Sequence, residues 1–152
     1  MARLFLWLLF VGALVTSNGC GPGRPPGARP TKKVTVTVLY KGAPVEGAAV
    51  TFVNQDGPPV ANGRTDAQGK AKLTTYIDGD GATLGTHKVM IDKSEAVGGQ
   101  SVSTDDPKYD PYAKPATVKY HLPQKYGNIA TSGITAEVKA DGPNEFTFDL
   151  KD

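Results

Sequence analysis

The chain has 152 residues, of which 21% are charged, and its formal net charge at pH 7 is +2. A charge so close to balance provides no basic surface of the kind that nucleic-acid binding needs, and it favours no acidic substrate. The length predicts one domain whose core needs neither a metal ion nor a disulfide, and the single cysteine excludes an internal disulfide.

Residues 1–19 have the pattern of a signal peptide. Arg3 gives a basic start, and an apolar run extends from Leu4 to Val15. This run is too short to cross a bilayer, which needs roughly 20 apolar residues, but it suits the apolar region of a secretory signal. The sequence therefore predicts an exported protein.

Cys20 follows this run directly, after the small residue Gly19. Signal peptidase for lipoproteins cuts before such a cysteine, which is then acylated, although Ser17 stands where bacterial lipoproteins usually have leucine. We expect the mature chain to begin at Cys20 and to be held at the cell envelope by acyl chains such as palmitate, because one chain alone binds a membrane only marginally. Residues 20–31 are rich in proline and glycine and are expected to form a flexible tether.

Residues 32–152 consist of short segments in which apolar and polar residues alternate, which is typical of strands with one buried face. Turns such as Asp66–Gly69 separate them. The predicted strands are Lys33–Tyr40, Ala48–Val53, Val60–Thr65, Lys70–Ile77, Gly85–Lys93, Thr117–Leu122, Ile134–Ala140 and Glu145–Leu150. With no helix expected after the signal, the pattern predicts an all-β domain, a single antiparallel β-sandwich of seven or so strands.

Three segments of this domain carry a family resemblance. They are KGAPVEGAAVTFV (Lys41–Val53), GRTDAQGKAKLTT (Gly63–Thr75) and GATLGTHKVMIDK (Gly81–Lys93). They resemble the carboxypeptidase-regulatory-like, or transthyretin-like (prealbumin-like), β-sandwich family. The tail SGITAEVKADGPNEFTFDL (Ser132–Leu150) resembles the closing strands of small bacterial lipoproteins that carry this domain. The resemblance implies a fold but no particular activity, because the family includes many binding and structural modules.

The two histidines do not predict a metal site. Intradiol dioxygenases, on a related sandwich, hold ferric iron with a His-x-His pair and tyrosines, and this chain has no such pair. Tyr120 and His121 are adjacent, so in a strand they point to opposite faces. We expect His87 to be a hydrogen-bonded strand residue and His121 to face solvent. Asp78–Gly81 is expected to be a plain turn, because Ala82 occupies the place of the third calcium ligand.

Other catalytic patterns are absent from the sequence as well. The Tyr-Arg-Gly-Ser motif of hydroxyisourate hydrolase, an enzyme with the transthyretin fold, does not occur, and neither does a Gly-x-Ser-x-Gly elbow, a Walker loop or a zinc-binding cysteine pair. We therefore expect a protein that is not an enzyme and has no cofactor and no metal. A metal-dependent enzyme is the alternative with the least support.

The segment Glu95–Pro115 is long and is expected to be mostly irregular, and such loops are either functional or disordered. The surrounding region contains four tyrosines that are candidate partner-binding residues, since tyrosine offers a large area and a polar tip. They are Tyr109, Tyr112, Tyr120 and Tyr126. The same side chains could instead pack the loop onto the sandwich, and we favour this second interpretation.

Together these features predict an exported, lipid-anchored, non-catalytic β-sandwich that acts as a binding or structural module at the cell envelope. The expected partners are the membrane, through Cys20, and an envelope protein or polysaccharide, with no nucleic acid. A carbohydrate-binding module on the same fold is the main alternative. Against it, the single tryptophan, Trp7, lies in the signal, so the mature domain lacks the side chain that stacks best on sugars.

Overall fold

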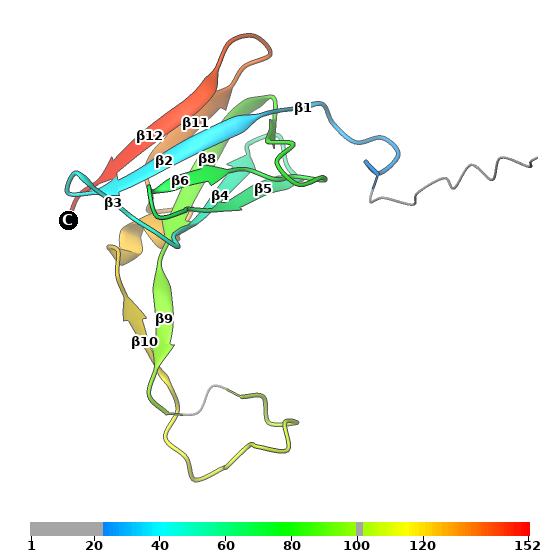
Figure 1. Cartoon of the computed structure of the whole chain (residues 1–152). Helices are drawn as coiled ribbons and strands as arrows, with labels where there is room; N and C mark the ends of the chain where they lie inside the picture. Colours follow the sequence, from blue (N-terminus) through cyan, green and yellow to red (C-terminus); the bar gives the residue numbers. More distant parts are fainter. Residues whose placement is uncertain (1–22, 100–101) are drawn as a thin grey trace, which may run out of the picture.

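The computed structural model describes residues 23–99 and 102–152 (Figure 1). The predicted signal peptide, Cys20 and Trp7 lie outside these residues. The described part is all-β, with one short 3-10 helix, η1, and it contains no helix that is long and apolar enough to cross a membrane. In chain order the elements are β1 Thr31–Lys32, β2 Val34–Tyr40, β3 Ala43–Pro44, β4 Ala49–Asn54, β5 Val60–Arg64, β6 Lys70–Lys72, β7 Ala82–Thr83, β8 Gly85–Asp92, β9 Ser94–Val97, β10 Thr117–Tyr120, η1 Gln124–Gly127, β11 Ile134–Val138 and β12 Asn144–Leu150.

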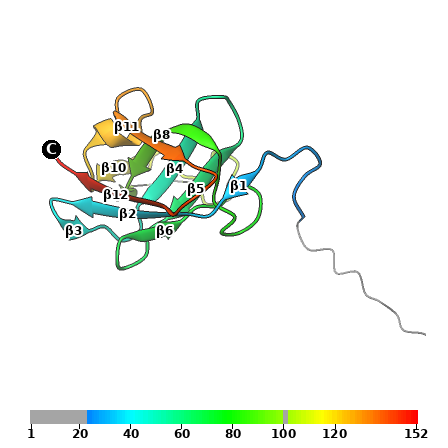
Figure 2. The same ribbon diagram turned by 90° about the horizontal axis from the view of Figure 1, so that it is seen from above.

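Two four-stranded sheets form the body of the molecule. One has the strand order β11-β8-β4-β5 and is antiparallel throughout. In the other, β2 pairs with β12 on one side and with β3 and β6 on the other. Viewed from above, the two sheets lie one over the other as two layers (Figure 2). The all-β class and the two-layered arrangement agree with the sequence prediction.

The pairing of β12 with β2 is parallel, which corrects the prediction of a wholly antiparallel arrangement. Parallel neighbours need a long crossover connection, and here almost the whole domain separates Tyr40 from Asn144. The alternation Phe146, Phe148, Leu150 gives the strand and its inner face, but it is the same for either direction. The direction of β12 therefore could not be read from the pattern.

The inner faces of the two sheets enclose one hydrophobic core, whose alternation is clearest in β2. Its three valines are at most 2% exposed, while the intervening threonines face outward. Phe52 of β4 reaches across to β12, where its ring centroid lies 5.8 Å from that of Phe146. The buried apolar residues are Val34, Val36, Val38, Val45, Ala48, Val50, Phe52, Ala61, Ala71, Leu73, Ala82, Val89, Ile91, Leu122, Ala136, Val138 and Leu150.

Most predicted strands are confirmed to within a few residues, but the one expected over Lys70–Ile77 ends at Lys72. Beyond it, the carboxylate of Asp80 accepts hydrogen bonds from the backbone N–H groups of Thr75, at 2.8 Å, and Tyr76, at 3.3 Å. These contacts fold residues 75–80 into a loop and take their backbone away from the sheet. The turn predicted at Asp78–Gly81 belongs to this loop.

The described end of the predicted tether contacts the same loop. Arg24 lies 3.6 Å from the Asp80 carboxylate and stands over the ring of Tyr76. The backbone N–H of Arg29 donates to the Tyr76 hydroxyl at 3.1 Å. Asp80 is therefore engaged by backbone groups and by an arginine, which leaves it a structural role in this loop.

Candidate binding arm

A two-stranded arm projects from the body of the molecule (Figure 1). β9 and β10 form it, pairing antiparallel from Ser94↔Tyr120 to Val97↔Thr117, and every residue of both strands is exposed. Residues 98–99 and 102–116 belong to its tip. The sequence predicts Glu95–Pro115 to be mostly irregular, so β9 is a correction. A four-residue strand with no buried side chain lacks the apolar alternation that reveals strands.

The two faces of the arm differ in chemistry. Ala96 and Val118 lie opposite each other, and Tyr120 is two residues further along the same face. Val118 is 55% exposed and Tyr120 is 47% exposed, so this face presents apolar surface to solvent. On the other face Glu95 lies opposite Lys119, with their charged groups 3.7 Å apart. The face with Val118 and Tyr120 is therefore the more apolar of the two and has no cover among the described residues, while the other face carries this ion pair beside Val97 and Thr117.

His121 holds the base of the arm. Its Nε2 lies 2.9 Å from Oε1 of Glu95, and its backbone N–H donates to the carbonyl of Lys93 at 2.8 Å. The hydrogen bond from His121 lowers the pKa of the Glu95 carboxyl below its ordinary value of 4.5. His121 is half-buried, which corrects the expectation that it faces solvent. The pair joins the strand entering the arm to the strand leaving it.

A groove of about 340 Å³ lies beside His121, where the arm meets the body. Its floor is apolar and includes Val45 and Leu122, and Glu46 and Lys93 add opposite charges at its rim. No sequence motif marked this groove, because its lining comes from three separate stretches of the chain. It lies at the junction of the arm and the body, and the side chains of Val45 and Leu122 that line it are themselves buried.

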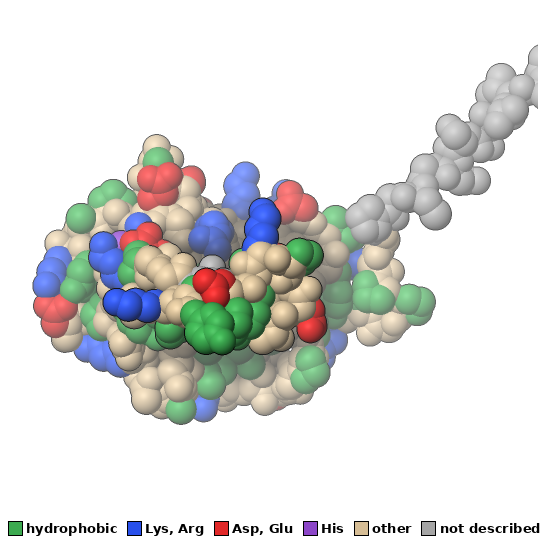
Figure 3. All heavy atoms as spheres, turned by 90° about the horizontal axis from the view of Figure 1, so that it is seen from below, with side chains coloured by type: hydrophobic (Ala, Val, Ile, Leu, Met, Phe, Trp, Pro, Cys, Tyr) green, Lys and Arg blue, Asp and Glu red, His purple; other side chains and the backbone are tan. Residues whose placement is uncertain are grey.

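The tip of the arm carries two of the predicted tyrosines. Tyr112 is 93% exposed and Tyr109 is 39% exposed. Tight turns built by aspartates shape this loop: Asp106 accepts the N–H of Lys108, and Asp110 accepts the N–H of Tyr112, each at 2.9 Å. Viewed along the arm from below, hydrophobic and acidic side chains stand together at its near end (Figure 3).

The four candidate tyrosines therefore occupy three different places. Tyr109 and Tyr112 are at the tip, and Tyr120 is on the apolar face of the arm. Tyr126 lies in η1, packs against the core, and donates from its hydroxyl to the carbonyl of Lys151 at 2.9 Å. The interpretation that we favoured from the sequence, in which these tyrosines pack the loop onto the sandwich, describes Tyr126 but not the tip residues.

His87 has a structural role, as predicted. It is 1% exposed, its Nδ1 lies 3.0 Å from the carbonyl oxygen of Gly85, and its ring contacts Phe52 at 5.7 Å between centroids. Burial lowers the pKa of this imidazole below its ordinary value of 6.5. Within residues 23–99 and 102–152, no three His, Cys, Asp or Glu side chains gather in a way that could hold a metal ion.

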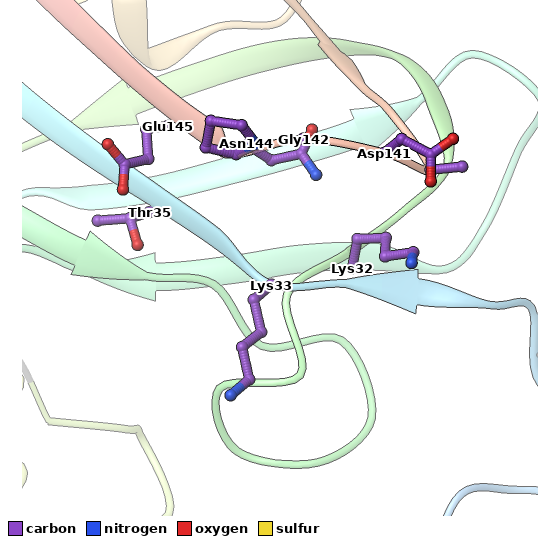
Figure 4. A pocket seen from close by; sticks show the side chains of 9 residues that line it. Lys32, Lys33, Thr35, Asp141, Gly142, Asn144 and Glu145 are labelled. Atoms are coloured by element: carbon purple, nitrogen blue, oxygen red, sulfur yellow. The ribbon is translucent and has the colours of Figure 1, made fainter.

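Another hollow, of about 480 Å³, lies between the start of β2 and the turn before β12 (Figure 4). It presents Lys32 and Lys33 on one side and Asp141 and Glu145 on the other. The side-chain amide of Asn144, at the edge of the hollow, already accepts a hydrogen bond from the N–H of Lys139 and donates one to its carbonyl. Its charges balance, and nothing in its geometry indicates a reaction.

Comparison with protein-family models, with curated proteins and with solved structures finds no match to this chain. The function must therefore be argued from the arm and the body themselves.

Proposed function

We propose that the protein is an exported, lipid-anchored, non-catalytic module that binds a partner protein at the cell envelope through its arm. The observation that carries the proposal is the exposed apolar face of a ribbon that stands away from the body. An isolated two-stranded ribbon is at best marginally stable in water, and contiguous exposed apolar surface marks interaction sites. A partner that covers Val118 and Tyr120 would supply the missing packing.

The anchor and the export belong to the same proposal and rest on the pattern of residues 1–20. The resemblance to transthyretin-like domains supports a binding role, because many members of that family are binding modules. The aliphatic side chains of Ala96 and Val118 favour protein as the partner, since they offer no hydrogen bonds to a sugar. The exposed ring of Tyr112 at the tip is the observation that supports the carbohydrate-binding alternative, because exposed aromatic rings can stack on sugars.

Site-specific photo-crosslinking in intact cells tests the proposal directly. A photoreactive side chain is placed in the full-length protein at Val118, at Tyr112 or at Val60, an exposed valine of β5 on the body. We expect one discrete protein adduct from Val118 and Tyr112 and none from Val60. Adducts of equal yield from all three positions, or none from any of them, would show that the arm is not the binding element.

A second comparison separates protein from polysaccharide. Retention on purified envelope polysaccharide is measured for the wild-type domain and for the Tyr109→Ala/Tyr112→Ala double variant. Retention that depends on the two tyrosines, together with no adduct at Val118, would assign the arm to carbohydrate. The anchor is tested separately by incorporation of a labelled fatty acid, which Cys20→Ala should abolish.

A further inference from the structure

The last strand, β12, is an open edge of its sheet. The carbonyl of Leu150 accepts the N–H of Lys41 at 3.0 Å, which shows that its backbone groups point towards β2. Backbone groups alternate in direction along a strand, so those of Glu145, Thr147 and Asp149 point away from β2. None of them has a hydrogen-bond partner within residues 23–99 and 102–152. Three N–H and three C=O groups are therefore available along this edge.

Apolar surface adjoins this edge. Phe146 and Phe148 turn inward from β12, and their rings stack on each other with centroids 6.3 Å apart. Both pack against the core but remain partly exposed, as does Ile134 on the facing strand β11. β11 and β12 do not pair with each other, so the two sheets are open on this side. On the opposite side a bridge between Asn62 and Thr74 joins the sheets.

The charges on β12 argue against a second copy of the chain as the occupant. In an antiparallel pair of β12 strands centred on Thr147, Glu145 of each copy would lie opposite Asp149 of the other. Like charges directly opposite each other destabilise a strand pair, and charged residues on an edge are a common protection against self-pairing.

A shift of the register by two residues would separate these like charges, but it is obstructed in both directions. A shift of two residues one way would require Lys151, whose backbone N–H and C=O are both engaged by the Tyr126 hydroxyl. A shift the other way would require Pro143, which has no N–H to donate.

We propose that the edge of β12 accepts an extended segment of a partner protein, which adds to the sheet as a strand. Lys or Arg residues of that segment would lie opposite Glu145 and Asp149, on the solvent face. The intervening residues would be apolar and would turn inward beside Phe146 and Phe148, whose exposed parts they cover. The backbone supplies affinity and the side chains supply specificity, as in other cases of strand addition. This site involves no residue of the arm, so it stands independently of the arm's proposed function.

The test uses a fluorescein-labelled peptide with the sequence Gly-Val-Lys-Val-Thr-Val-Lys-Val-Gly, and a matched peptide in which both lysines are replaced by glutamate. Binding to the purified domain is followed by fluorescence anisotropy. Thr147→Pro removes one outward N–H without removing a bond to β2, and Thr147→Ala, which keeps that N–H, is its control. We expect the lysine peptide to bind wild-type protein and Thr147→Ala alike, and to bind Thr147→Pro about tenfold more weakly.

A charge reversal guards against a failure of Thr147→Pro to fold. Glu145→Lys/Asp149→Lys should bind the glutamate peptide in preference to the lysine peptide, which reverses the wild-type order. Val118→Lys, on the arm, should leave peptide binding unchanged. The proposal is overturned if wild-type protein does not bind the lysine peptide, if Thr147→Pro binds it as tightly as wild type, or if the arm variant alone abolishes binding.

Discussion

Changing Glu145 to lysine should convert a protected edge into a self-associating one. In the strand pair centred on Thr147, this change replaces two like-charge pairs by two pairs of lysine with Asp149. A cross-strand charge pair contributes roughly 0.2–1 kcal/mol, and a like-charge pair destabilises by a similar amount, so each reversal is worth about 1 kcal/mol. The two symmetry-related pairs together give about 2 kcal/mol, or roughly a 30-fold lower dissociation constant for the dimer.

Sedimentation velocity over a range of protein concentrations measures this effect. Glu145→Lys should shift toward the dimer, and added salt should reverse the shift because the pairs are exposed. Glu145→Gln, which removes the repulsion without adding attraction, should lie between Glu145→Lys and wild type. Glu137→Lys makes the same charge change on β11, and it should stay with wild type. If Glu145→Lys is as monomeric as wild type, or if Glu137→Lys associates equally, the argument from the edge of β12 is wrong.

Three further outcomes are expected. Burial lowers the pKa of His87 in the folded state, so the unfolded chain binds more protons. The free energy of unfolding should therefore be highest above the ordinary pKa of 6.5 and should fall as the pH drops below it. Urea titrations of His87→Gln should show a flatter dependence of this free energy on pH. His121 lowers the pKa of Glu95, so the stabilisation that this pair gives is present above the ordinary pKa of 4.5 and is lost as the pH falls through the pKa of the folded state. Glu95→Gln should speed amide exchange in β9 and β10. The melting temperature should stay nearly unchanged, because the pair is exposed. Gly79 and Gly81 both have positive φ, but a Cβ at Gly81 would meet the Lys32 carbonyl oxygen at 1.7 Å, whereas one at Gly79 meets nothing within 4 Å. Gly79→Ala should therefore cost only the backbone strain of roughly 1–2 kcal/mol, and Gly81→Ala should destabilise the domain by more. Equal melting temperatures for the two variants would contradict this.

The body of the protein could be predicted from its sequence because its strands are half-buried. β2 has three valines separated by threonines, and β11 buries Ala136 and Val138 between exposed polar residues. This alternation is imposed by the core and is visible in the chain. The same reasoning placed His87 correctly, because it shares a face with Val89 and Ile91.

The arm could not be predicted in the same way, because no core imposes a pattern on it. Ser94–Val97 buries nothing, and its pairing with Thr117–Tyr120 joins two short segments across a long loop. The tyrosines of this region are close in sequence, but their environments are set by tertiary structure. Tyr126 reaches the core through η1, while Tyr112 is carried to the far end of the arm.

The open edge of β12 was hidden for a different reason. The pattern from Asn144 to Leu150 gives the inner face of the strand, but the order of strands in a sheet is a long-range property. Only the parallel pairing with β2 shows that Glu145, Thr147 and Asp149 point their backbone groups outward. With this direction known, Glu145 and Asp149 are interpreted as charges that oppose the pairing of two β12 strands, which the amino-acid composition does not indicate.

The arm and the edge of β12 ask for different chemistry from a partner. The arm offers apolar side-chain surface, whereas β12 offers mainly backbone hydrogen bonds flanked by acid. One partner protein that engages both would gain through effective concentration, because binding at one site makes the second event intramolecular. If one partner uses both sites, Val118→Lys and Thr147→Pro should each weaken its binding to the intact protein. The double variant, which lacks both sites, should abolish that binding. Two separate partners would instead give variants that each abolish one adduct and leave the other unchanged. Crosslinking from Val118 and from Asp149 in the same cells distinguishes these cases, since one partner gives adducts of one size at both positions.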